Sequence, residues 1–378
     1  MFHTIVTLGY ILPNIYVFLR VGQLFINKGY KLYYTLIYLL LALLYPYVSL
    51  VSRLNSGVFF DSLSVVASYI LPFYLYLFLS VLLYDVFLLV NLVVGVVPAE
   101  RRKRTDYKVS SLSAIIVLSV VVVLAGAINF NTIRVSDYRI EVPGKSSKLD
   151  HLKIAFASDF HLKMQTELHF VERFAVEIAA IQPDLLIYGG DIVEGRGDGA
   201  KMDQIAKILS KIQVKYGVFA VLGNHESYGA LAKGHFFDKA GMQVLCDTVV
   251  MPGHAFNLAG RFDDRYRERK ATKELLQSAN GALPVILVDH RPTGIEENSK
   301  TVADVQFSGH THNGQLFPLN LIIDSIYRIG WGYEKIENTH FFVSSGIMLW
   351  GPPVRTTGKS EIMVVEVEFR SGELKVEN

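Results

Sequence analysis

Cysteine and charge are both scarce in this sequence. The 378 residues include a single cysteine, Cys246. One thiol excludes an intrachain disulfide and a thiolate metal cage, so any metal must bind through oxygen and imidazole ligands. Charged residues make up 19% of the chain, and the formal net charge is +2. Because nucleic-acid-binding proteins need a concentrated basic face, we expect no nucleic acid as a partner.

Apolar residues are abundant and gather before residue 130. They make up 51% of the chain, and the mean hydropathy is +0.31. Four stretches approach the roughly 20 residues that a helix needs to cross a bilayer. These stretches are residues 5–19, 33–50, 71–97 and 111–128. We therefore predict a transmembrane region of about four helices in residues 1–130, with the membrane lipid bilayer as a partner, and a second domain in residues 131–378.

Basic residues near these stretches predict their orientation, because positively charged loops tend to stay in the cytoplasm. The second connection offers only Arg53, whereas the first and third connections are basic. The basic residues of the first and third connections are Arg20, Lys28, Lys31, Arg101, Arg102, Lys103, Arg104 and Lys108. This distribution predicts that the domain after residue 130 is extracytoplasmic.

Asp85 is the one charged residue within the third apolar stretch. An intramembrane carboxylate marks a functional site by default. On that interpretation the chain would be a small transporter or channel with a regulatory tail. The alternative is that Asp85 lies near a helix end or faces water, and that the helices are only an anchor.

After residue 130 short apolar runs alternate with helical stretches and polar turns, a pattern typical of an α/β domain with a mixed sheet. We predict helices at 168–181 and 202–212. The predicted strands are 153–157, 185–188, 218–222, 244–246, 285–288, 305–307, 341–343 and 362–367. Polar segments directly follow five of these strands. Because the carboxyl ends of strands are where loops converge, we expect these segments to meet in one crevice.

The five segments are Asp159-Phe160-His161, Gly190-Asp191, Gly223-Asn224-His225-Glu226, Asp289-His290 and Gly309-His310-Thr311-His312. Each segment alone is more often structural than functional. Together they offer enough oxygen and imidazole ligands for two cations. Two cations about 3.5–4 Å apart need a shared anionic ligand, and such a pair can orient a phosphate and lower the pKa of a water molecule. Asp191 is the natural bridge, because Gly189 and Gly190 let the backbone turn tightly before it.

In their order these segments resemble the motif set of the calcineurin-like metallophosphoesterase superfamily over residues 150–370. The continuation His312-Asn313-Gly314-Gln315, with the later Ser344-Ser345-Gly346 and Pro353-Val354-Arg355, is similar to the membrane-associated bacterial branch. The resemblance implies a four-layer α/β/β/α sandwich and a location in the bacterial plasma membrane. It assigns no chemistry to the segment Arg261-Phe262-Asp263-Asp264.

The resemblance also implies the roles of individual residues. It places Asp159, His161, Asp191 and His312 around a first metal. It places Asp191, Asn224, His290 and His310 around a second metal. His225 would be the catalytic imidazole and Glu226 its orienting neighbour. The ligand types suit manganese, iron, zinc or cobalt, of which manganese or iron is favoured.

We therefore expect a membrane-anchored phosphoesterase that hydrolyses a phosphodiester or pyrophosphate bond by hydroxide attack, with a lipid or cell-envelope phosphate as a reasonable substrate. A catalytically silent scaffold or signalling protein is the alternative. Four further residues carry open interpretations. Asp289 either orients His290 or ends a strand, and Arg355 either contacts a phosphate or forms a structural ion pair. Trp331 and Trp350, in glycine-bearing loops, touch either lipid or substrate, or neither.

Overall fold

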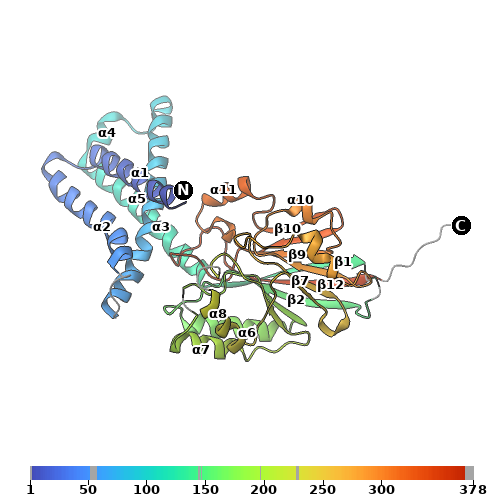
Figure 1. Cartoon of the computed structure of the whole chain (residues 1–378). Coiled ribbons are helices and arrows are strands. Elements are labelled where there is room, and N and C mark those ends of the chain that lie inside the picture. The colour runs from blue at the N-terminus through green and yellow to red at the C-terminus, as the bar shows by residue number, and fades with distance from the viewer. Residues whose placement is uncertain are drawn as a thin grey trace. The chain divides into compact units, whose positions relative to one another are not determined.

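The computed structural model describes residues 2–51, 58–143, 145, 147–195, 197–226 and 230–370. Arg53, which we used to predict the orientation, lies outside this set. The chain forms two compact units (Figure 1). The first comprises Met1–Ile128 with Gly351–Thr356, and the second comprises Asn129–Trp350 with Thr357–Asn378. Each unit is described by itself below.

The first unit consists of helices. They are α1 (Phe2–Leu24), the short η1 (Lys28–Tyr30), α2 (Lys31–Val51), α3 (Val58–Val94), α4 (Ala99–Lys103) and α5 (Thr105–Phe130). Within the described residues, three regions are long and apolar enough to cross a membrane, namely Lys28–Val48, Ser62–Val94 and Thr105–Phe130. We predicted four spans, but α1, which contains Pro13, is not one of these three.

An ion pair joins α1 and α3 inside the first unit. Arg20 Nη2 lies 2.7 Å from Asp85 Oδ1, and the Tyr16 hydroxyl also donates to the Asp85 carboxylate. Arg20 therefore lies within a helix, so our use of it as a loop residue in the orientation argument was wrong. Asp85 therefore has polar partners within the helices and does not lie alone among apolar residues.

The segment Gly351–Thr356 belongs to the first unit although its neighbours in sequence belong to the second. The Arg355 backbone N–H donates to the carbonyl of Gly126 in α5 at 2.9 Å. A Cβ on Gly126 would lie 2.6 Å from a methyl group of Val354, so only glycine permits this approach. The Arg355 side chain is fully buried, which favours its structural interpretation over contact with a substrate phosphate.

The second unit contains two six-stranded sheets. The strands of the first sheet, in spatial order, are β1 (Ile133–Pro143), β12 (Ser360–Arg370), β2 (His151–Ala157), β3 (Leu185–Tyr188), β4 (Val218–Ala220) and β5 (Gln243–Val244). The strands of the second are β10 (Gly332–Ile336), β11 (Thr339–Val343), β9 (Val305–Ser308), β8 (Val285–Val288), β7 (Asn257–Gly260) and β6 (Thr248–Val250). All eight predicted strands overlap strands of these sheets, whereas β1, β6, β7 and β10 were not predicted.

The two sheets pack face to face between two layers of helices (Figure 1). Alternation along β2 shows why: Ala155 and Ala157 face the helical layer, whereas Ile154 and Phe156 face the other sheet. One sheet is covered by α6 (Leu168–Ile181), α7 (Ala200–Leu209) and α8 (Ala230–Lys239), and the other by α9 (Thr272–Leu275), η3 (Leu276–Ser278) and α10 (Ile295–Asn298). Helix α11 (Leu319–Ile326) has no buried residue. The prediction of a four-layer α/β/β/α sandwich preceded by apolar helices is confirmed.

The last residue of α5 is built into the second unit. The ring of Phe130 stacks on Phe170 of α6 with centroids 5.7 Å apart, and the Ser360 hydroxyl donates to the Phe130 carbonyl at 2.6 Å. Strand β1 begins at Ile133 and pairs in parallel with β12, starting with Ile133 opposite Ser360. The two sheets therefore follow the last apolar helix with only two intervening residues.

Candidate metal centre

Parallel strands carry all the predicted site residues to one edge of the sheets. In the first sheet β2, β3 and β4 run parallel, and in the second β8 and β9 do. Each of these strands is directly followed by one of the five polar segments. Their side chains form three overlapping groups whose ligand atoms lie within 4.8 Å of one another. The groups are Asp159, His161 and His312; His161, Asp191 and His225; and Asp191, His290 and His310.

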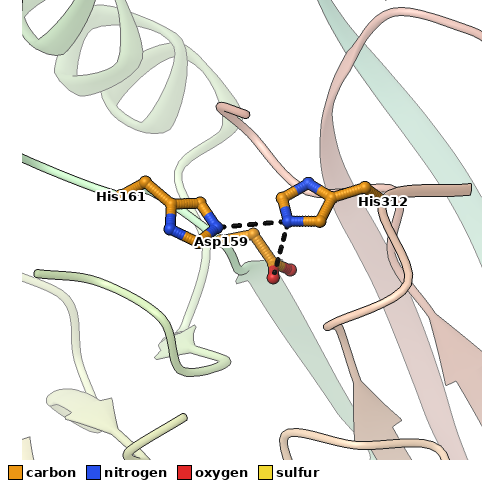
Figure 2. Close-up of side chains that lie close together, drawn as sticks. All are labelled: Asp159, His161 and His312. Atoms are coloured by element: carbon orange, nitrogen blue, oxygen red, sulfur yellow. Dashed lines mark hydrogen bonds and ion pairs between the residues drawn. The ribbon is translucent and has the colours of Figure 1, made fainter. Parts of the chain in front are cut away.

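The first group joins a loop of each sheet (Figure 2). His161 Nε2 lies 3.1 Å from His312 Nε2, and the latter nitrogen lies 3.5 Å from Asp159 Oδ1. Asp159 is buried, and its Oδ2 accepts hydrogen bonds from the Ser158 hydroxyl at 2.6 Å and the His310 backbone N–H at 3.1 Å. These bonds hold the carboxylate in place between the two imidazoles.

Asp191 belongs to the other two groups and lies between them. Its Oδ2 is 3.2 Å from His290 Nε2, and its Oδ1 accepts the His225 backbone N–H at 2.8 Å. The other ring nitrogen of His290 lies 2.8 Å from the Gly189 carbonyl, a contact that fixes the ring orientation. The remaining predicted ligand, Asn224, is buried and directly precedes His225 in the sequence.

The electrostatics of the site favour metal-binding forms of its side chains. Burial and the neighbouring His312 ring hold the pKa of His161 well below its usual range. Burial and the neighbouring His290 ring also hold the pKa of His310 well below its usual range. Burial alone would raise the pKa of Asp191, but His290 and the other nearby imidazoles hold it well below its usual range. Neutral imidazoles and an ionised carboxylate are the forms that coordinate divalent cations.

His290 differs from the other imidazoles. Burial would lower its pKa, but the carboxylates of Asp191 and Asp159 raise it to about 10. A positive charge on this ring balances the carboxylates in the absence of a cation. The donor set of carboxylates and imidazoles within a few ångströms therefore fits one or more divalent metal ions, which would take over this charge balance.

The backbone of the site is strained. Five of the seven predicted ligands have positive φ angles, namely Asp159 at 59°, His161 at 43°, Asp191 at 50°, His310 at 71° and His312 at 50°. Non-glycine residues rarely adopt this conformation, and such residues cluster at functional sites where the surrounding structure imposes it. No sequence pattern predicted this feature.

Two glycines let the loops approach closely enough to form the groups. Gly190 has φ 94°, and a Cβ there would lie 2.6 Å from His290 Nδ1. A Cβ on Gly223 would lie 2.2 Å from Asp191 Oδ1. Any side chain at either position would push a candidate ligand out of place.

Glu226 supports the loop that carries Asp191. We predicted it as the neighbour that orients His225, but its buried carboxylate accepts backbone hydrogen bonds at 2.6–3.0 Å from four residues. The donors are Asp191, Ile192, Val193 and Gly223. Burial and the nearby Asp191 carboxylate raise the pKa of Glu226 to about 7. Glu226 therefore positions two of the loops at once.

A buried ion-pair network, which we did not predict, braces the loop of His290. Asp289 is fully buried, lies 2.9 Å from Arg261 Nη1 and also contacts Arg269. Asp263, equally buried, lies 2.7 Å from Arg291 Nε. Asp289 thus pairs with arginines from the neighbouring loop. The segment to which we assigned no chemistry supplies Arg261 and Asp263, and its charged residues after a buried strand were the available signal.

Comparison with known proteins places these residues in context. Residues 152–314 match the family described as calcineurin-like phosphoesterase. A protein from Aquifex aeolicus named as an uncharacterized metallophosphoesterase is 32% identical over 62% of this chain and 92% of its own length. One from Campylobacter jejuni is 27% identical over 97% of this chain and 98% of its own, so that alignment includes the N-terminal helices. One from Helicobacter pylori is 31% identical, and the chain spans 61% of its length.

Proposed function

Because the chain belongs to the calcineurin-like phosphoesterase family, we propose that it hydrolyses a phosphodiester or pyrophosphate bond with two divalent metal ions. The observation that carries this proposal is the sharing of Asp191 between two ligand groups. A carboxylate in that position meets the need of two adjacent cations for a common anion.

The ligand assignment is the one that the family resemblance implies, and it differs from the three groups by adding Asn224 and leaving out His225. Asp159, His161, Asp191 and His312 would hold one ion, and Asp191, Asn224, His290 and His310 the other. When bound, two such ions would lower the pKa of a water molecule and neutralise the phosphate oxygens. Manganese or iron suits these ligands, and zinc or cobalt fits the same donor types.

His225 is the residue that we propose to act on the substrate. It lies within reach of His161 and Asp191, with its ring centroid 4.7 Å from that of His161. Unlike most candidate ligands it is only half-buried, so its ring is open to an incoming ester. In the protonated form it would stabilise charge developing on the phosphate and donate a proton to the leaving oxygen.

We propose that the enzyme acts at the surface of a bacterial plasma membrane, with the catalytic unit outside the cytoplasm. The membrane location is supported by three helices that are long and apolar enough to span a bilayer. The basic cluster of α4 and early α5, directly before the last of them, supports the orientation. An anchored enzyme would meet lipid or cell-envelope phosphates without diffusion through bulk solvent.

A catalytically silent metal-binding scaffold is the alternative. It would keep the ligand groups, but it would not need His225 to be open to solvent.

Hydrolysis of bis-p-nitrophenyl phosphate by the full-length protein in detergent tests the proposal. The protein is stripped of metal, resupplied with Mn²⁺ and compared with the His225→Ala variant. We expect manganese-dependent turnover that falls at least about 100-fold in the variant, the scale of losing general acid catalysis. Binding of two equivalents of metal without turnover of this diester or of a monoester would favour the scaffold. Failure to bind metal would overturn both readings.

A further inference from the structure

Helix α11 carries an exposed apolar face. Leu319, Ile322 and Ile326 follow one another at spacings that place them on one side of the helix, and they are 39%, 54% and 64% exposed. Phe317, directly before the helix, is 51% exposed. None of the eight residues of α11 is buried. Single exposed apolar residues are normal, but a contiguous group of them marks an interaction surface.

This apolar face is tied to the candidate metal centre. Helix α11 begins seven residues after His312. In the intervening loop the Asn313 side chain donates to the Thr357 carbonyl at 2.9 Å, and the Thr357 N–H donates to the Gln315 carbonyl at 3.4 Å. These bonds attach the loop between His312 and α11 to the residues that precede β12.

An exposed tryptophan extends the face toward the start of β1 and β12. Trp331 is 39% exposed, and its indole N–H donates to Glu361 at 2.8 Å. The guanidinium of Arg134 lies over its ring at 4.9 Å. Arg134 and Glu361 are each the second residue of their strand. Tryptophan is enriched at membrane–water interfaces, where its apolar ring and polar N–H meet different surroundings.

The start of β1 and β12 is also where the chain leaves its last apolar helix. Two residues separate Phe130, at the end of α5, from Ile133, and the three Cα–Cα steps between them span at most about 11 Å. At this same edge the Ser360 hydroxyl donates a hydrogen bond to the Phe130 carbonyl. The covalent connection therefore keeps this edge of the second unit close to the end of a helix that can span the bilayer.

We infer that Leu319, Ile322, Ile326 and Trp331 form a lipid-contacting face that inserts into the membrane interface and presents the metal centre to a phosphoester carried by a bilayer lipid. This inference rests on the proposed function and names its substrate class. The lipid's phosphate would reach the metal ligands while its acyl chains stay in the bilayer. Because α11 contains no basic residue, apolar insertion rather than attraction to anionic lipids would drive the contact.

Tryptophan fluorescence tests the contact directly. The chain has two tryptophans, so the Trp350→Phe variant of the full-length protein reports Trp331 alone. In phosphatidylcholine vesicles we expect brominated acyl chains to quench this emission, with little change between low and high salt. Absence of quenching would overturn the inference. If sedimentation then showed a dimer, a second copy of the chain would be the occupant of the face.

Matched substrates test the function of the face. Phosphatidyl-p-nitrophenol in vesicles and bis-p-nitrophenyl phosphate in solution release the same chromophore from a diester. For the double variant Ile322→Ser and Ile326→Ser, we expect kcat/KM to fall about tenfold or more on the lipid and less than about twofold on the soluble ester, since the variant loses two apolar side chains that would be buried in the bilayer. The matched control is Val176→Ser on α6, 66% exposed in the native chain, which should change neither rate.

The other outcomes separate the inference from the proposed function. Equal loss on both substrates would make α11 a structural support for His312 and overturn the lipid contact, as would no loss on either. Absence of turnover by the native chain on both substrates would refute the proposed function, and the quenching experiment would still decide whether lipid contacts Trp331.

Discussion

At the scale of single residues, Asp191 is where the candidate site is most vulnerable. It is shared by two ligand groups, and it receives hydrogen bonds or close contacts from His225 and His290. We predict that Asp191→Asn lowers turnover at least about 100-fold, because an amide cannot supply the charge that two cations share. Hydrolysis of bis-p-nitrophenyl phosphate and the metal content of the purified protein measure the effect.

Asp85→Asn is the matched control for that variant. It also removes one carboxylate charge, but from the Arg20 ion pair among the helices. We expect turnover within about twofold of the native protein if the helices are only an anchor, since Asp85 belongs to the first unit and to none of the ligand groups. A loss of turnover equal to that of Asp191→Asn would show that Asp85 is a functional residue.

Glu226 gives a second prediction at this scale. Its carboxylate accepts four backbone N–H groups, and Glu226→Gln would turn an amide donor toward some of them. Each buried donor left without an acceptor costs about 1–3 kcal/mol, so the variant should melt at a lower temperature even in metal-free protein. If only the metal-loaded protein lost stability, Glu226 would act on the metal and not on the loops.

At the scale of elements, the sequence predicted the strands that carry the site better than it predicted the strands that frame them. Strand β3 is uniformly apolar and followed by Gly-Gly-Asp, a pattern readable by eye. Strand β1 was missed because Arg134, Asp137 and Arg139 interrupt its apolar residues. Its place comes from pairing with β12, more than 200 residues away, which no local pattern reports.

The candidate ligands could be named from their places after strands and from the family resemblance, but the contacts that support them could not. Positive φ angles at Asp159 and Asp191 arise from long-range contacts that hold each loop, and the two residues are not glycine. The same is true of Arg20, whose charge suggested a cytoplasmic loop until Asp85 appeared as its partner on another helix. A charge in a sequence does not reveal whether its partner is solvent or another side chain.

The junction of β1 and β12 yields a prediction about pH. Burial alone would raise the pKa of Glu361, but bonds from Ser136, Ser345 and Trp331, together with Arg134, lower it. A lowered pKa in the folded state means that this carboxylate stabilises the fold above its ordinary value of 4.5 and stops doing so as pH falls through the folded-state value.

Glu361→Gln should therefore lower stability by about 2 kcal/mol at pH 7 and by much less in acid, where the native glutamate is protonated as well. Thermal melts of both proteins over this pH range, followed by tryptophan fluorescence, measure the difference. An equal gap at every pH would mean that shape, and not charge, is what Glu361 contributes.

At the scale of the whole molecule, the orientation of the chain can be tested with a single thiol. In a Cys246→Ser background, Glu172→Cys places a thiol on the exposed side of α6, and Glu100→Cys places one beside the basic cluster. If the catalytic unit is exported, a membrane-impermeant maleimide should label only the first variant in intact cells. Labelling of Glu100→Cys alone would reverse the proposed topology.

The return of Gly351–Thr356 to the helical unit has a consequence for dissecting the protein. The chain passes between the two units three times, near residues 128, 350 and 356. A fragment that begins at residue 129 would keep this hexapeptide but lose Gly126 and Tyr76, against which it is hydrogen-bonded. Val354 and the buried Arg355 would then face solvent. The second unit is therefore not a module that a single cut can release, because residues 351–356, which lie between its segments in the sequence, belong to the first unit.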